Sequence, residues 1–262
     1  MRRSEDGEEI LTGGGVNHVV RVAGTVRRPT GPWTPAVHAL LRHLAGRGFT
    51  GAPRVHGVDE QGREVLGFVA GETADHPLPA WARTDEALTG AARLLRRYHD
   101  ATAGFTPPPG AVWYLPPVEP AEVICHGDVA TYNTVFRDGE PVAFIDFDTA
   151  HPGPRLWDVA YAAYRFVPLT DPGHAGGAPV AEQARRLGLF AGAYGLGDDA
   201  LKALPDMAVT RLERLVAFMR ERAAAGDAAF AGHVARGDDR LYERDMAHLA
   251  RHAGELTCRT RR

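Results

Sequence analysis

Three side chains with hard oxygen atoms fall close together near the middle of the chain. Asp128 and Asn133 are five residues apart, and Asp146 follows thirteen residues after Asn133. Carboxylate and amide oxygens suit Mg²⁺ better than zinc. An ionised carboxylate beside apolar strands also needs a partner or a metal, because burying it alone is costly. The residue types therefore predict a magnesium site, provided that the fold brings the three residues together.

The segments around these residues are typical of a hairpin. An apolar run at 134–136 leads through the turn Arg137-Asp138-Gly139-Glu140 into a second apolar run at 141–145. Two strands joined by so short a turn pair antiparallel. Such pairing would fold Asp146 back toward Asn133.

The wider chain divides into a strand-rich part and a helical part. Short apolar runs separated by glycine turns cover most of residues 9–69. Thr34-Pro35 is a helix-start signal, followed by apolar residues at helical spacing: Val37, Leu40, Leu41 and Leu44. From Trp157 onward the pattern is mostly helical. We predict an α+β fold with a β-rich N-terminal lobe at 1–71 and a mainly helical C-terminal lobe at 72–262.

Composition excludes several classes of protein. With 44% apolar and 24% charged residues, the 262-residue chain is typical of globular proteins, and its net charge of −3 does not favour nucleic-acid binding. No apolar run reaches the ~18 residues that a membrane span needs. Two cysteines, Cys125 and Cys258, are too few for a disulfide scaffold. The polar, acidic start has no secretory pattern, so we expect a cytoplasmic protein without membrane or nucleic-acid partners.

Basic residues in this chain are almost all arginine. Lys202, in the helical part, is the only lysine among 30 basic residues. A site in the N-terminal lobe that ordinarily uses lysine must therefore use arginine or do without.

The central segment resembles a known enzyme family. His126-Gly-Asp-x-x-x-x-Asn133, followed by Ile145-Asp146, is similar to the catalytic loop and metal aspartate of the aminoglycoside phosphotransferase family. The downstream segment Gly153-Pro-Arg-Leu-Trp-Asp158 is similar to the one that follows the metal site in that family. These enzymes are small-molecule kinases of the two-lobed protein-kinase-like fold. The resemblance therefore implies that fold over most of the chain.

The same resemblance implies a reaction and the residues that perform it. Asp128 would be the catalytic aspartate, which orients a substrate hydroxyl and accepts its proton. Asn133 and Asp146 would hold Mg²⁺ against the phosphates of ATP. The implied function is transfer of the γ-phosphoryl group of ATP, or of another nucleoside triphosphate, to a small-molecule hydroxyl. The acceptor would be an aminoglycoside-like antibiotic, an amino alcohol or another metabolite.

Nucleotide contacts are implied in the N-terminal lobe. They comprise a glycine loop over the phosphates and a hinge that reads adenine through its backbone: Gly13, Gly14, Gly15, Phe68, Val69 and Ala70. The position that usually carries a phosphate-binding lysine best fits Arg27, shortly before Pro29, with Arg21 and Arg28 as rivals. The glutamate that usually pairs with this base has no counterpart, because no acidic residue lies between Arg28 and Val58. That pair is absent or rebuilt.

Alternatives remain open at this stage. The unusual base and missing glutamate leave a nucleotide-binding pseudokinase or scaffold as the alternative function. A protein kinase is disfavoured, because the few residues between Asp146 and Gly153 leave no room for an activation segment. Asp148 is open between a metal contact and a substrate contact. We interpret Asp158 as a structural brace and His126 as a structural histidine.

Overall fold

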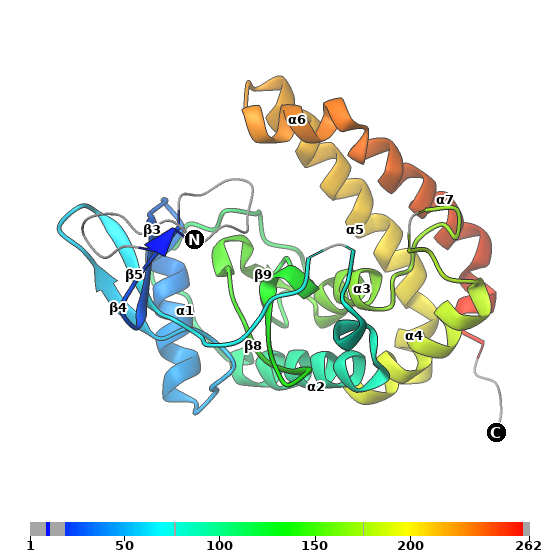
Figure 1. Ribbon diagram of the computed structural model, residues 1–262, viewed down its shortest axis with the longest axis horizontal. Coiled ribbons are helices and arrows are strands. Elements are labelled where there is room, and N and C mark those ends of the chain that lie inside the picture. Colours follow the sequence, from blue (N-terminus) through cyan, green and yellow to red (C-terminus); the bar gives the residue numbers. More distant parts are fainter. Residues whose placement is uncertain (1–8, 11–18, 76, 175, 259–262) are drawn as a thin grey trace.

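In the computed structural model, which describes residues 9–10, 19–75, 77–174 and 176–258, strands and helices separate along the chain. The N-terminal strands form a sheet with one long helix beside it, and most of the later chain is helical (Figure 1). This confirms the predicted α+β class. The lobe boundary at residues 71 and 72 stays a prediction.

The N-terminal sheet is antiparallel and has the strand order β1-β2-β3-β5-β4. Its strands are β1 (Glu9–Ile10), β2 (Val20–Val22), β3 (Thr25–Pro29), β4 (Val55–Val58) and β5 (Arg63–Gly67). The pairing of β3 with β5 sets Arg28 directly opposite Glu64. β3 ends at Pro29, which has no N–H to donate to a ladder. This register decides which side chain of β3 reaches the site.

Helix α1 (Thr34–Gly46) lies between β3 and β4 in the chain and confirms the helix predicted from apolar spacing. Its four predicted apolar residues are each at most 1% exposed: Val37, Leu40, Leu41 and Leu44. Burial of each such side chain contributes about 1.5–3 kcal/mol. These residues belong to one core that continues into the helical part, so α1 is fixed relative to the site.

The rest of the described chain consists of helices and short strand pairs. The helices are α2 (Asp85–Thr102), α3 (Arg155–Phe166), α4 (Val180–Tyr194), α5 (Asp198–Ala224), α6 (Ala228–Arg236) and α7 (Asp238–Leu256). The strands are β6 (Val123–Cys125), β7 (Thr134–Arg137), β8 (Glu140–Phe144) and β9 (His151–Gly153). β7 pairs with β8, as predicted, and β6 pairs with β9. Among the described helices, none has the length and apolar character of a membrane span.

The sheet and the helical part meet at a two-way backbone contact. The N–H of Glu72 donates to the carbonyl of Phe136 (3.0 Å), and the N–H of Phe136 donates to the carbonyl of Glu72 (2.8 Å). The chain leaving the sheet is thereby attached to β7. This contact ties the N-terminal strands to the hairpin that precedes Asp146.

Asp158 on α3 braces the loop that follows β6. Its carboxylate accepts hydrogen bonds from the backbone N–H groups of His126 (2.8 Å) and Gly127 (3.0 Å), and it lies 3.0 Å from Nε2 of His99. Burial alone would raise the pKa of Asp158, but His99 and these hydrogen bonds outweigh it and lower the pKa to about 2. The ionised carboxylate confirms the brace predicted from the sequence.

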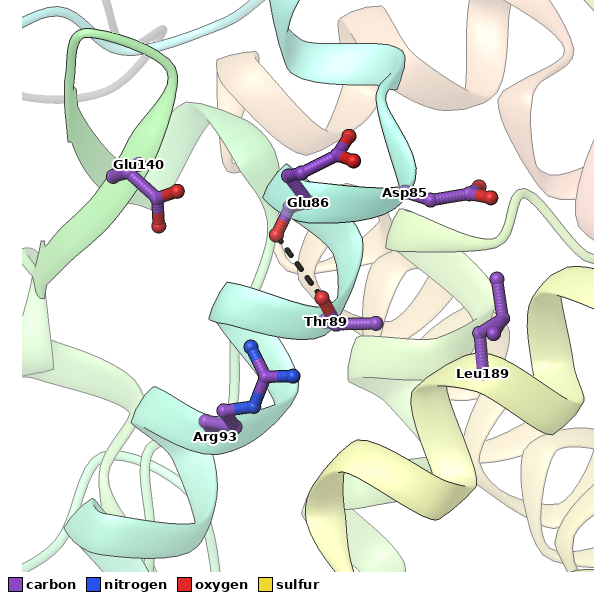
Figure 2. Close-up of a pocket in the computed structure, with 6 residues that line it drawn as sticks. All are labelled: Asp85, Glu86, Thr89, Arg93, Glu140 and Leu189. Atoms are coloured by element: carbon purple, nitrogen blue, oxygen red, sulfur yellow. Dashed lines mark hydrogen bonds between the residues drawn. The ribbon is translucent and has the colours of Figure 1, made fainter.

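A surface hollow of about 330 Å³ lies along the first half of α2 (Figure 2). Its lining residues are Asp85, Glu86, Thr89, Arg93, Glu140 and Leu189. None of them belongs to the predicted site. The Asp85 carboxylate is already held by Arg185 at 2.6 Å. The hollow therefore plays no part in positioning the site.

The brace predicts a pH-dependent contribution to stability. The pKa of Asp158 falls from 3.8 to about 2 on folding, so its stabilisation is complete above pH 4 and is lost as the pH falls through 2. The gap in unfolding free energy between wild type and Asp158→Asn should therefore shrink by about 2 kcal/mol between pH 6 and pH 2, with about half of the change by pH 3. Urea unfolding at pH 6, 4 and 3 measures this gap.

The matched control is Asp206→Asn, at an exposed position of α5. Its gap to wild type should stay constant over the same pH range. A gap for Asp158→Asn that does not change with pH would contradict the ionised brace.

Candidate active site

The loop after β6 carries Asp128, and Gly127 shapes that loop. Gly127 has a φ of 84°, and a Cβ atom there would lie 2.4 Å from the carbonyl oxygen of Thr149. Only glycine fits this combination of positive φ and close approach. Arg211 on α5 donates from Nη2 to the carbonyl oxygen of Gly127 at 2.7 Å. The loop is therefore held at its N–H groups by Asp158 and at its carbonyl by Arg211.

His126 is fully buried and uses both ring nitrogens within the loop. Its Nδ1 accepts from the backbone N–H of Asp128 (3.3 Å), and its Nε2 lies 3.1 Å from the carbonyl oxygen of Ile145. The second contact requires Nε2 to donate, which fixes the neutral tautomer. Burial lowers the pKa of His126, in agreement with a neutral ring. The interpretation as a structural histidine is confirmed.

Asp128 is partly exposed, and its carboxylate is held from two sides. Tyr132 donates from its hydroxyl to Oδ1 at 2.8 Å, and Asn133 donates from Nδ2 to Oδ2 at 2.8 Å. Asn133 also donates to the backbone carbonyl of Asp128 at 3.0 Å. Both N–H bonds of the amide are thus engaged with Asp128, which fixes where the Asn133 side-chain oxygen lies.

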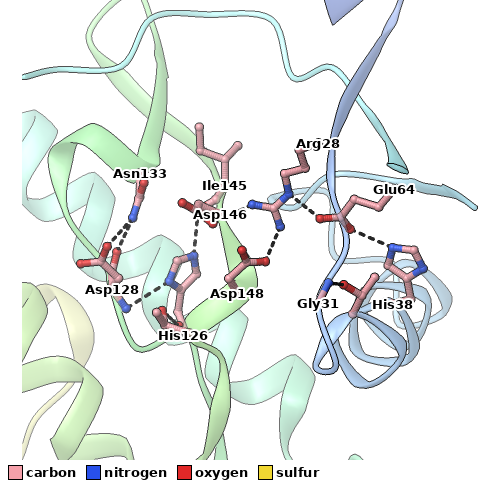
Figure 3. Close-up of polar contacts among 12 residues, drawn as sticks. Arg28, Gly31, His38, Glu64, His126, Asp128, Asn133, Ile145, Asp146 and Asp148 are labelled. Carbon is pink, nitrogen blue, oxygen red and sulfur yellow. Dashed lines mark hydrogen bonds and ion pairs between the residues drawn. The ribbon is translucent and has the colours of Figure 1, made fainter. Parts of the chain in front are cut away.

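Asp146 is brought beside Asn133 by the β7–β8 hairpin. The N–H of Ile145 donates to the carbonyl of Asn133 at 2.9 Å, so Asp146 directly follows a residue paired with Asn133. Asp146 adopts a left-handed conformation (φ 62°, ψ 69°), and 48% of its side chain is exposed. The structure thus gathers Asp128, Asn133 and Asp146 in one place (Figure 3).

Arg28, not Arg27, is the basic residue that reaches this cluster. Its Nη1 donates to Oδ1 of Asp146 and its Nη2 to Oδ1 of Asp148, each at 2.7 Å. Its Nε forms an ion pair with Glu64. The Arg28 side chain is buried, and burial opposes its charge, but the three carboxylates together raise its pKa above the ordinary value for arginine. Figure 3 shows the guanidinium between β5 and the segment after β8.

The register expected for β3 is therefore off by one residue. Arg27 points to the opposite face of the sheet, where its Nε lies 3.5 Å from Oδ2 of Asp59. Successive side chains of a strand alternate between faces, so an error of one residue exchanges the two sides. Pro29 marks the strand end but carries no information about which face meets the helical part.

The acidic partner of this base comes from the sheet itself. Glu64 on β5 is 1% exposed and pairs with Arg28, while its Oε2 lies 2.9 Å from Nε2 of His38. His38 is on α1, the helix in which the sequence lacks an acidic residue. The base-and-acid pair that the sequence left open is therefore present in another form. Glu64 is the acid that pairs with Arg28, and His38 is the residue of α1 that contacts Glu64.

Asp148 joins the same cluster. Burial raises its pKa to about 6, although Arg28 opposes the shift. Its contact with Arg28 places it beside Asp146. The strand expected here is absent, because Asp146 is left-handed and Phe147–Thr149 form a short 3-10 helix. Its role, left open by the sequence, includes at least holding Arg28.

The other predicted nucleotide contacts stay untested. Gly13, Gly14 and Gly15 are outside the described residues. Of the hinge residues, Phe68 lies beneath Arg21, whose guanidinium is 3.9 Å from the ring centre, and the Ala70 carbonyl accepts from Arg137 at 2.8 Å. Val69 between them is partly exposed. Their predicted contact with adenine stays a prediction.

The sequence did not identify three residues around Asp128: Tyr132, Arg165 and Arg211. Tyr132, four residues after Asp128, bonds its carboxylate, and the hydroxyl of Tyr161 lies 3.4 Å from that of Tyr132. Arg165 on α3 lies over the Tyr132 ring at 5.2 Å, and Arg211 lies over the Tyr161 ring at 4.6 Å. Only the closeness of Tyr132 to Asp128 in the sequence could have indicated it. The two arginines are placed by helix packing.

The donor set fits a hard cation. Asn133 has its amide oxygen left after both N–H bonds are used, and Asp146 keeps an oxygen that Arg28 does not engage. Mg²⁺ typically takes one or two carboxylates from protein and completes its octahedron with water and phosphate oxygens. Within the described residues, no group of three or more His, Cys, Asp or Glu is arranged to hold a metal by itself. The arrangement therefore suits a metal shared with a phosphate ligand.

Comparisons with known proteins agree with this geometry. Residues 110–204, which include Asp128, Asn133 and Asp146, match the pattern of the phosphotransferase enzyme family. The chain is 39% identical over 212 residues to the trifolitoxin immunity protein of Rhizobium leguminosarum bv. trifolii, a match that covers 78% of this chain and 80% of the relative.

Solved structures show the same fold at low sequence identity. The GDP complex of aminoglycoside 2'-phosphotransferase-IIIa superposes with a TM-score of 0.59 and 16% identity, covering 92% of each chain. Ethanolamine kinase from Plasmodium vivax superposes with a TM-score of 0.65 and 12% identity, covering 96% of this chain and 84% of the other. These matches confirm the predicted kinase-like fold. With the family pattern and a relative of 39% identity in agreement, the chain belongs to the phosphotransferase enzyme family.

Proposed function

We propose that this phosphotransferase uses ATP and Mg²⁺ to phosphorylate a hydroxyl group of a small molecule. The observation that carries the proposal is the convergence of Asp128, Asn133 and Asp146, joined by the buried base Arg28. Phosphoryl transfer requires a partly exposed carboxylate, two hard oxygen ligands and a phosphate-binding cation.

Asp128 is assigned the proton transfer. Its carboxylate is partly exposed and is oriented by Tyr132 and Asn133, so it can hold a substrate hydroxyl in line with the phosphorus. The hydroxyl oxygen bonds to the γ-phosphorus while the bond to the bridging oxygen breaks and ADP leaves. The hydroxyl proton passes to the Asp128 carboxylate.

Asn133, Asp146 and Arg28 are assigned to the phosphates. When bound, Mg²⁺ would neutralise phosphate charge, and Asn133 and Asp146 would hold it through their oxygens. A guanidinium carries five N–H bonds, and Arg28 directs three of them to Glu64, Asp146 and Asp148. The remaining two N–H bonds are left for phosphate oxygens.

The proposed acceptor class is supported by the name of the relative. Its name, trifolitoxin immunity protein, supports an acceptor among antibiotics. Incubating the protein with ATP, Mg²⁺ and panels of aminoglycosides, peptide antibiotics, amino alcohols and nucleosides tests the proposal. A product heavier by one phosphate, together with ADP release, is the expected result. ATP binding without product or ADP release would favour the pseudokinase alternative instead.

Replacing the Asp128 carboxylate by an amide should abolish most turnover. Asp128→Asn keeps the size of the side chain but cannot accept a proton, so kcat should fall at least ~10²-fold. ATP affinity by calorimetry should change little. Asp138→Asn, on the exposed β7–β8 turn, is the control and should keep wild-type kcat. Equal kcat in wild type and Asp128→Asn would remove Asp128 from the mechanism.

The metal assignment predicts Mg²⁺-dependent nucleotide binding that relies on Asp146. Calorimetry of ATP binding in Mg²⁺ and in EDTA should give clearly tighter binding with Mg²⁺ for wild type. The difference should be lost in Asp146→Ala and Asn133→Ala, because each removes a hard oxygen ligand. Identical wild-type affinities in the two buffers would contradict the assignment.

The corrected register predicts that Arg28, not Arg27, binds phosphate. Arg28→Ala should weaken ATP binding by about 10- to 150-fold, the range for a lost charge-assisted contact. Arg28→Lys keeps the charge but not the planar guanidinium, so it should weaken ATP binding less. Arg27→Ala is the matched control, because Arg27 faces Asp59 on the other side of the sheet, and its ATP affinity should stay near wild type. A melting temperature for each variant separates loss of binding from loss of the Arg28–Glu64 pair. Weak binding in Arg27→Ala with normal binding in Arg28→Lys would reverse the assignment.

A further inference from the structure

Arg165, at the C-terminal end of α3, has no counter-charge in the described part of the chain. It makes no hydrogen bond or ion pair with a described residue, and its Nε is buried without a partner. Buried or half-buried arginines are ordinarily paired, because removing a guanidinium from water without compensation is unfavourable. An unpaired guanidinium beside a catalytic carboxylate therefore indicates a missing anion.

The surroundings of Arg165 hold it in place without neutralising it. Its guanidinium carbon lies 5.2 Å from the ring centre of Tyr132 and 6.0 Å from that of Tyr164. Aromatic faces attract a cation but carry no net charge. Tyr132 in turn donates to Asp128 at 2.8 Å, so a single tyrosine ring separates Arg165 from the catalytic carboxylate. A ligand group at Arg165 would belong to the molecule whose hydroxyl lies at Asp128.

The later helices do not supply the missing anion. Every acidic residue from 225 to 258 contacts an arginine or a histidine among the described residues: Asp227, Asp238, Asp239, Glu243, Asp245 and Glu255. Arg220 alone holds two of these carboxylates. The acidic side chains of α6 and α7 are thus already paired, which does not favour binding of a polycation. Arg165 has no such pair in the part of the chain that the structure describes and is available to an anion.

We propose that Arg165 binds a carboxylate of the acceptor, so that the substrate is a hydroxyl compound that also carries a negative charge. The planar guanidinium matches a carboxylate through paired N–H bonds. Tyr132 and Tyr161, whose hydroxyls lie 3.4 Å apart, both lie near Arg165 and Asp128. The inference rests on the proposed phosphotransferase function and specifies its acceptor.

The test uses acceptor pairs that differ only in charge. 4-Hydroxybutanoate, 6-hydroxyhexanoate and 8-hydroxyoctanoate are each compared with the corresponding amide, and kanamycin serves as the polycation. The kcat/KM for formation of the phosphate ester is measured by mass spectrometry. At the best chain length the acid should exceed its amide at least ~10-fold, the usual scale for a charge-assisted pair.

Arg165→Gln should reduce this acid-to-amide ratio to about 1, whereas Arg93→Gln, at an exposed position on α2, should leave it at the wild-type value. A melting curve checks that Arg165→Gln is folded. Equal use of acid and amide, preference for kanamycin, or an unchanged ratio in Arg165→Gln would each overturn the inference.

Failure of the inference is distinguishable from failure of the proposed function. If no compound of the panel is phosphorylated but ATP is still converted to ADP in wild type and not in Asp128→Asn, the carboxylate assignment is wrong and the phosphotransferase assignment stands. If ADP release is absent or independent of Asp128, the proposed function fails, and the inference fails with it.

Discussion

The guanidinium of Arg28 is the interaction on which the candidate site depends. It joins Glu64 of the sheet to Asp146 and Asp148 of the segment after β8, so one cation connects the N-terminal strands to the proposed metal ligand Asp146. Three carboxylates around one guanidinium leave excess negative charge in a largely buried place. Burial, with Asp146 close by, raises the pKa of Asp148 to about 6. A second cation at this point is therefore favoured by electrostatics as well as by ligand chemistry.

The loop that carries Asp128 is held by the helices around it. Asp158 of α3 binds its N–H groups, and Arg211 of α5 binds the carbonyl of Gly127. Two different helices thus satisfy the backbone N–H groups of His126 and Gly127 and the carbonyl of Gly127, which fixes the orientation of the loop. The same two helices carry Tyr161, Arg165 and Arg211 to the side of Asp128. The packing of α3 against α5 therefore positions both the Asp128 loop and the side chains beside it.

Local parts of the site were predictable from the sequence, and long-range parts were not. Asp128, Asn133 and Asp146 are connected by one loop and one tight hairpin, so their spacing sufficed to predict that they meet. The α+β order of elements followed from hydrophobic periodicity in the same way. The choice between Arg27 and Arg28 depends on which face of β3 meets the helical part, and pairing with β5 decides it. The Glu64–His38 contact and the place of Arg165 arise from packing between elements distant in sequence, which no local pattern encodes.

The presence of arginine instead of lysine at position 28 has a consequence for chemical labelling. Reagents that acylate amines mark a nucleotide site through the nucleophilic nitrogen of a lysine, whereas a guanidinium stays protonated and does not react in this way. The only lysine of the chain, Lys202 on α5, has an exposed side chain near Asp199 and is not part of the cluster around Arg28. An amine-directed nucleotide probe would therefore leave the cluster around Arg28 unlabelled, even with a nucleotide bound as proposed.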